Sequence, residues 1–163
     1  MSNPIEAFFD TSVLIAASDA TDTRHLSSRS LLAAATPAIA ACGAHTLAEV
    51  YAVLSRLPGG KRVRPQFAGL LVEQIESRMT VVPLSAEEYA ATLATAAQMD
   101  LAGGIVFDAL LLACARKVNA QRIYTWNEKH FRRVAPDLAN RIVRPQTSKL
   151  ALPINWVNPC ASP

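Results

Sequence analysis

Three acidic residues, Asp10, Glu49 and Asp108, are the candidates for chemistry in this sequence. Asp10 directly follows the short apolar segment at residues 5–9, and Asp108 is the only charged residue in the apolar run at residues 105–115. A carboxylate in such surroundings is costly unless it is paired, capped or bound to a metal. Carboxylates without His or Cys companions form a hard-oxygen site, which suits Mg²⁺ or Mn²⁺ and usually handles phosphates. There the metal polarises a phosphoryl oxygen and lowers the pKa of a bound water, which then attacks.

Each of these acids also has a structural explanation. Asp10 and Asp108 both stand where a helix could begin, so either could be an N-cap. Thr46-Leu47-Ala48-Glu49 has the spacing of a capping box, in which the Glu49 side chain would satisfy the helix start. What favours a functional site is the combination, because three acids at the starts of elements lie after or inside apolar segments.

Other catalytic motifs are absent from the chain. It has no phosphate-binding glycine loop, zinc-protease helix, dinucleotide-binding fingerprint or nucleophile elbow. A phosphohydrolase of the haloacid dehalogenase type would need a second Asp where Ser12 stands. His25, His45 and His130 have no metal-ligand spacing, and we expect His25 at the surface and His45 at the entry to a helix.

Short β-like segments alternate with longer helical ones and must position these acids. The expected strands are residues 5–9, 38–42, 79–84 and 122–125. The expected helices are residues 13–17, 25–35, 46–57, 65–78, 86–99, 107–118 and 128–133. This alternation predicts an α/β fold, a three-layer α/β/α sandwich with a mostly parallel sheet. Ligands bind beyond the carboxyl ends of parallel strands, where Asp10 and the Thr125-Trp126-Asn127-Glu128 segment would meet.

Composition limits the kind of protein further. The 163 residues are 51% hydrophobic and 18% charged, which excludes intrinsic disorder and weakly suggests oligomerisation. No apolar run is long enough for a membrane span, so we expect no association with a membrane. The three cysteines form no C-x-x-C pair, so we expect a location in the reducing cytoplasm. We expect one domain at residues 1–143 and a Pro-rich tail, not a separate domain, at residues 144–163.

Positive charge is distributed unevenly along the chain. The net charge is +3 with 16 Lys and Arg, of which four lie at residues 56–64 and nine at residues 116–149. Such clusters are compatible with a phosphate-bearing partner, although solvated faces would give the same pattern.

Four segments together resemble the PIN-domain ribonucleases, and more narrowly the VapC-type toxins of bacterial toxin–antitoxin pairs. They are FFDTSVL at residues 8–14, LAEVY at 47–51, FDALL at 107–111 and YTWNEKHF at 124–131. The resemblance spans residues 5 to about 143. It implies a compact α/β/α fold and a Mg²⁺- or Mn²⁺-dependent endoribonuclease, neutralised by a cognate antitoxin and forming a homodimer.

The resemblance also implies roles for individual residues. Asp10, Glu49 and Asp108 match the family's core acids: Asp10 and Asp108 would hold the metal, and Glu49 would position or deprotonate the attacking water. The products would carry 5′-phosphate and 3′-hydroxyl ends. Thr125 matches a hydroxyl that helps to hold the site together, and Thr11 is a further supporting residue.

One residue of the four segments departs from the family's pattern. The family's fourth acidic position falls at Asn127. Its amide can donate an oxygen to a metal or water but adds no charge for the binding of a second metal. This departure favours the alternative of a non-catalytic PIN-fold module that binds RNA or protein.

Trp126 could stack on a base, although a Trp that ends a strand is more often core. The candidates to hold the RNA backbone are Arg56, Lys61, Arg62, Arg64, Lys129, Arg132 and Arg133.

Overall fold

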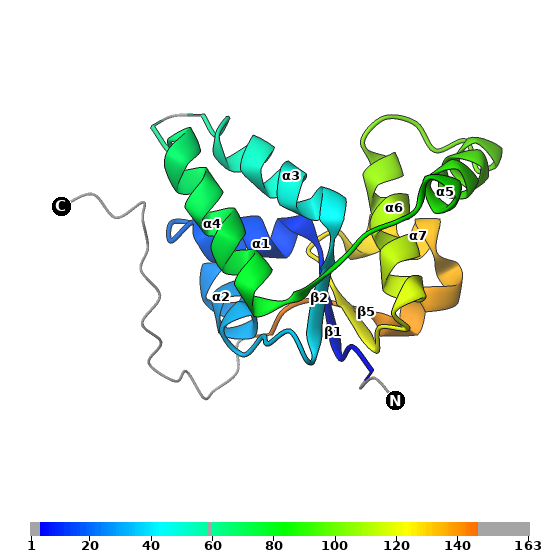
Figure 1. The fold of residues 1–163 in the computed structure, drawn as a ribbon, viewed down its shortest axis with the longest axis horizontal. Helices are drawn as coiled ribbons and strands as arrows, with labels where there is room; N and C mark the ends of the chain where they lie inside the picture. Colours follow the sequence, from blue (N-terminus) through cyan, green and yellow to red (C-terminus); the bar gives the residue numbers. More distant parts are fainter. Residues whose placement is uncertain (1–3, 59, 147–163) are drawn as a thin grey trace.

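The computed structural model describes residues 4–58 and 60–146, in which a central sheet lies between two groups of helices (Figure 1). The strands are β1 (Ala7–Phe9), β2 (Ala40–Gly43), β3 (Thr80–Val82), β4 (Arg122–Tyr124) and β5 (Ile142–Val143). The helices are α1 (Thr11–Ser18), α2 (His25–Ala33), α3 (Ala44–Leu54), α4 (Pro65–Arg78), α5 (Ala86–Gln98), α6 (Ile105–Lys117), α7 (Glu128–Val134) and the 3-10 helix η1 (Pro136–Arg141).

The sheet has the strand order β3-β2-β1-β4-β5, and all of its neighbouring strands pair in parallel. Strand β1 is therefore central, with β2 and β4 on its two sides. The predicted three-layer α/β/α fold with a parallel sheet is confirmed.

Alternating side chains of the strands feed two separate cores. Phe8 and Ala41 face the cluster formed with α6, α7 and η1, whereas Phe9 and Cys42 face the cluster formed with α1 to α4. Successive residues of a strand point to opposite faces of the sheet, so the neighbours Phe8 and Phe9 contribute one side chain to each core. This explains why the strands read as continuous apolar runs, as expected for a parallel sheet covered on both sides.

Several predicted elements differ from the observed ones. The sequence did not predict η1 or β5, because two residues of strand carry no periodic signal. Helices α3 and α6 each begin two residues earlier than expected, at Ala44 and Ile105. His25 is buried rather than at the surface, with Nδ1 3.1 Å from the carbonyl oxygen of Ala16.

Two other predictions touch this description. None of the described helices is long and apolar enough to cross a membrane. The proposed tail at residues 144–163 lies mostly outside the described residues, so the boundary at residue 143 stays a prediction.

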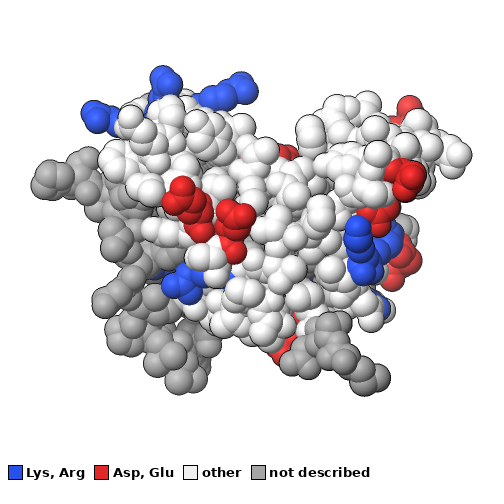
Figure 2. Space-filling model, viewed as in Figure 1, with Lys and Arg blue, Asp and Glu red and all other residues white. Residues whose placement is uncertain are grey.

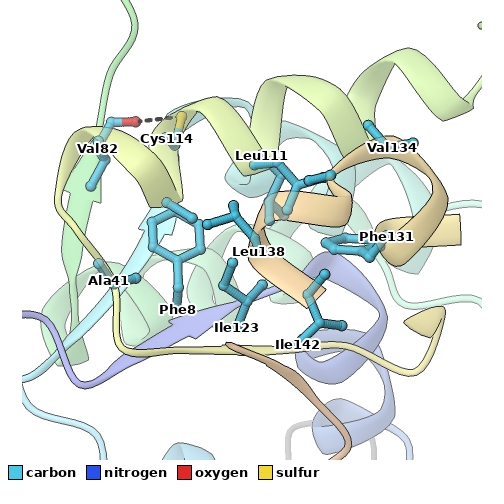
Figure 3. Close-up of a cluster of buried hydrophobic side chains, with 14 of the residues drawn as sticks. Phe8, Ala41, Val82, Leu111, Cys114, Ile123, Phe131, Val134, Leu138 and Ile142 are labelled. Atoms are coloured by element: carbon cyan, nitrogen blue, oxygen red, sulfur yellow. Dashed lines mark hydrogen bonds between the residues drawn. The ribbon is translucent and has the colours of Figure 1, made fainter. Parts of the chain in front are cut away.

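The cluster under α6 makes a clear prediction about stability. Leu111 is 1% exposed and packs among Phe8, Ile123 and Phe131 (Figure 3). We expect Leu111→Ala to lower the free energy of unfolding by about 2 to 5 kcal/mol, because it leaves a cavity in a packed core. Urea denaturation measures this, with Leu93→Ala as control because Leu93 is 47% exposed. Equal losses in both variants would contradict the assignment of Leu111 to the core.

Candidate active site

The three acids approach one another at the carboxyl ends of the central strands. Asp10 directly follows β1, and its backbone N–H donates to the carbonyl of Tyr124, the last residue of β4, at 3.0 Å. Glu49 lies in the second turn of α3, which starts where β2 ends. Asp108 lies in the first turn of α6.

Two hydroxyl groups hold the carboxylate of Asp10. This side chain is 4% exposed, and its Oδ2 accepts hydrogen bonds from Ser12 Oγ at 2.5 Å and Thr125 Oγ1 at 2.7 Å. Burial raises the pKa of Asp10, and the two hydroxyl hydrogen bonds oppose that rise.

Backbone groups fix the direction of both hydroxyl hydrogen bonds. The N–H of Trp126 donates to Ser12 Oγ at 3.0 Å, and the N–H of Asn127 donates to Thr125 Oγ1 at 2.9 Å. Because each hydroxyl oxygen accepts from an N–H, its own proton is available for Asp10. The segment after β4 thus orients a carboxylate that follows β1.

Ser12 is therefore a site residue that sequence reasoning missed. In the sequence analysis, Ser12 served only to exclude a phosphohydrolase of the haloacid dehalogenase type, which would need a second Asp at this position. Its position two residues after Asp10 is the available signal, since Ser side chains bond to near neighbours in chain turns. Asp10 does occupy the N-cap position of α1, but its side chain makes no capping hydrogen bond. The backbone N–H groups of Thr11 and Ser12 face the carboxylate and lower its pKa without reaching cap geometry.

Glu49 is held by a residue next to Asp10. Its Oε2 accepts a hydrogen bond from Thr11 Oγ1 at 2.8 Å. Burial is the main cause that raises the pKa of Glu49, and the charge of Asp10 adds to it, while the Thr11 hydrogen bond opposes both. The capping-box explanation of Glu49 is wrong, because α3 begins at Ala44 and the buried Thr46 Oγ1 has no hydrogen-bond partner.

The pKa of Asp108 is raised as well. Burial, followed by the charges of Asp10 and Glu49, raises the pKa of Asp108 to about 7. The N-cap explanation is wrong for this residue too, since the N-cap position of α6 is Gly104. The three carboxylates thus lie within electrostatic reach of one another, and no Lys or Arg is among the causes of their shifted pKa values.

The donor set fits a hard divalent cation. Within residues 4–58 and 60–146, no three His, Cys, Asp or Glu side chains form a ready-made metal cage. Mg²⁺ does not need one, because it is commonly held by one or two carboxylates, waters and substrate phosphate. Burial, and after it the charges of Asp10 and Glu49, disfavour the charged form of Asp108, and a bound cation would offset both, so the chemistry of this site matches that ion.

The segment after β4 has different roles at each position. Asn127 is exposed and contacts the site through its backbone N–H rather than through its amide. Trp126 is half-buried against the core, its Nε1 donates to Ser28 Oγ at 3.0 Å, and the guanidinium of Arg24 lies 5.7 Å from its ring centroid. This agrees with the expectation that Trp126 serves the core rather than base stacking.

The seven candidate cations lie in two places, the α3–α4 connection and α7. Arg132 of α7 is paired with Glu128 at 3.2 Å and donates to the carbonyl of Ile142 at 3.1 Å. Lys61 of the α3–α4 connection is paired with Asp19 at 3.3 Å. The other five are exposed, and within the described chain no hydrogen bond or ion pair holds their side chains: Arg56, Arg62, Arg64, Lys129 and Arg133.

The Thr125 hydroxyl gives a test of how the site is held. We expect Thr125→Val to lower the catalytic activity of this site about 10- to 100-fold, the usual cost of losing a partner that orients a ligand. Thr125→Ser keeps the hydroxyl and should retain most of the activity. Initial rates and thermal unfolding of both variants measure this. Equal loss in the Ser and Val variants, or full activity of the Val variant, would show that the hydroxyl hydrogen bond to Asp10 is not what the activity depends on.

Comparisons with known proteins agree with this geometry. The family model for the PIN domain matches residues 7–136. Ribonuclease VapC27 of Mycobacterium tuberculosis is 37% identical over 83 residues, which are 50% of this chain and 58% of that protein. The chain thus spans just over half the length of this curated relative.

Two solved structures share the fold. The structure of Mycobacterium tuberculosis VapC20, described as a Sarcin-Ricin loop cleaving toxin, superposes with a TM-score of 0.62 at 24% identity, over 77% of this chain and 92% of that one. VapBC2 from Rickettsia felis, bound to a DNA fragment from its promoter, superposes with a TM-score of 0.55 at 20% identity, over 85% and 97%.

Proposed function

Since this chain belongs to the PIN domain family, we propose that it is a metal-dependent endoribonuclease that acts as the toxin of a toxin–antitoxin pair. The observation that carries the proposal is the group of three carboxylates at the ends of β1, β2 and β4: burial raises the pKa of all three, and the charge of Asp10 adds to the rise at Glu49 and Asp108. The similarity to Ribonuclease VapC27 supports RNA as the substrate.

The proposed mechanism gives each acid one task. Asp10 and Asp108 would hold Mg²⁺ or Mn²⁺, which supplies Lewis-acid polarisation of the phosphodiester and a water of lowered pKa. Glu49, whose Oε2 is fixed by Thr11, orients the attacking water and accepts its proton. Its raised pKa suits a general base better than that of an ordinary Glu. The products would carry 5′-phosphate and 3′-hydroxyl ends.

Supporting residues complete the proposed site. Ser12 and Thr125 keep Asp10 oriented, and Asn127 contributes its backbone N–H to this arrangement. We place the protein in the cytoplasm as a homodimer that a cognate antitoxin neutralises, as in the VapC-type toxins it resembles. The exposed amide of Asn127 favours the second candidate, a non-catalytic module that binds RNA or protein.

Expression without antitoxin distinguishes these two functions and works whichever RNA is the target. Growth and total RNA are compared for the parent chain, Asp10→Asn and the matched control Asp100→Asn. Asp100 is exposed with φ of 54°, a conformation that Asn adopts readily, so the control changes charge without strain. Arrest with new RNA fragments in the parent and control, but not in Asp10→Asn, supports the ribonuclease. Equal growth of all three with soluble protein favours the binding module.

A further inference from the structure

One face of α3 leads from the carboxylates to the basic connection between α3 and α4. Glu49, Ala52, Val53 and Arg56 are spaced three and four residues apart, so they share that face. Ala52 and Arg56 are exposed and Val53 is 39% exposed. The N–H of Arg56 donates to the carbonyl of Val53 at 3.0 Å, which extends the helical turn to Arg56. We name these four residues the α3 stripe.

The basic connection beyond the stripe is anchored to the fold. Val63 is 5% exposed, and its N–H donates to the carbonyl of Leu54 at 3.0 Å, at the end of α3. Arg62 and Arg64 flank this inward residue and are exposed. In extended backbone, neighbours of an inward side chain point outward, so the two guanidiniums face solvent. Lys61 is used instead for the ion pair with Asp19, which ties this connection to the segment after α1.

Charge is concentrated at this end of the molecule. Figure 2 shows Lys and Arg side chains gathered over the end of the lobe where α3 meets α4, and a hollow between this lobe and the one formed by α5 and α6. Arg56, Arg62 and Arg64 are exposed cations that no ion pair holds within the described chain. On α7, Arg132 is bound to Glu128, while Lys129 and Arg133 are exposed.

We propose that a single RNA strand leaves the carboxylate site along the α3 stripe and that Arg56, Arg62 and Arg64 bind its phosphates. The inference rests on the proposed function and names the surface that holds the substrate. Arg56 stands seven positions after Glu49, a rise of roughly 10 Å at helical spacing, which is about three nucleotides of a stacked strand. The exposed Ala52 and Val53 leave room for the strand between these two ends.

RNA binding measured in the Asp10→Asn background, which stops cleavage, tests this surface. The probe is a fluorescein-labelled, unstructured RNA of about 20 nucleotides, long enough to span both ends of the stripe. The test variant replaces Arg56, Arg62 and Arg64 by Gln. The control variant replaces Arg116, Lys117 and Arg122 by Gln, which removes the same charge from exposed positions that are not RNA-binding candidates.

We expect the test variant to bind RNA at least about tenfold more weakly near physiological salt, because three phosphate contacts are lost. The slope of log affinity against log salt concentration is negative and should become shallower by about 2, since each phosphate contact to a single strand contributes about −0.7. The control should change affinity at most about threefold through its general effect on charge. Thermal unfolding should differ little between the two, because the test variant breaks no ion pair and the control breaks only the exposed pairs to Asp137 and Glu88.

The outcomes separate this inference from the proposed function. Equal weakening by both triple variants, or none by the test variant, overturns the assignment of the α3–α4 connection. If the parent cuts RNA in cells while the test variant binds RNA normally but fails to bind an acidic protein partner, this surface is a protein-docking site and the inference is wrong. Failure of the ribonuclease itself shows separately, as equal growth of the parent and Asp10→Asn.

Discussion

Replacing Asp10 by Asn is expected to lower the rate of RNA cleavage at least about a thousandfold, equivalent to about 4 kcal/mol of transition-state stabilisation. The physical reason is that Asn keeps the shape of Asp10 but removes the charge that would hold the cation. The amide also mismatches its neighbours, because the Oδ2 position receives two hydroxyl donors and an amide nitrogen cannot accept them.

Cleavage of total RNA by purified protein in Mg²⁺ or Mn²⁺ measures this loss. Asp100→Asn is again the matched control, and far-UV circular dichroism confirms that the variant folds. Activity within tenfold of the parent would remove Asp10 from the chemistry. A large loss that the Asp100 control shares would point to impurity or misfolding rather than to the site.

Asp108→Asn is expected to abolish cleavage while it stabilises the metal-free protein above about pH 5. Because the pKa of Asp108 is raised to about 7 in the folded chain, the folded state binds more protons than the unfolded state between that pKa and the ordinary value of 3.8. Stability therefore falls as pH rises through this window, and Asn does not suffer that fall. The gain should reach about 1 to 3 kcal/mol near pH 7.5, less than a fully buried group would give.

Thermal unfolding in a chelator from about pH 4 to pH 8 checks the sign of this effect. The melting temperatures of parent and variant should coincide at the acid end and separate by several degrees toward the alkaline end. Asp137→Asn is the control of opposite sign, because the Arg116 guanidinium lowers the pKa of Asp137. A melting-temperature difference that does not depend on pH would exclude Asp108 as the source of the strain.

Much of the architecture follows from local signals in the sequence. The capping box at Ser85 and Glu88 forms as the pattern predicts, with both hydrogen bonds present at the start of α5. Pro65 stands at the first turn of α4, where its missing N–H costs nothing. Buried apolar strands and helix starts therefore specify the order of elements and bring the carboxyl ends of β1 and β4 together.

The details of the site depend on contacts that sequence spacing does not encode. The Thr11 hydroxyl reaches Glu49 across 38 residues, and Thr125 reaches Asp10 across 115. The spacing that makes a capping box at Ser85 and Glu88 makes none at Thr46 and Glu49, because α3 already begins at Ala44 and Thr46 lies buried inside it. The surface position expected for His25 is wrong for a related reason, since a polar ring that bonds to a backbone carbonyl can lie in the core.

The long sequence distance between Asp10 and Thr125 has a consequence for synthesis of the protein. All three acids are already part of the growing chain before Thr125, the residue that fixes the Asp10 carboxylate, is added. Central strand β1 also lacks its neighbour β4 until then, so one edge of β1 is unpaired. Proteins of this size tend to fold as whole units, with non-local strand pairing as a late event. The site of a nascent chain therefore cannot be assembled before Thr125 has been added.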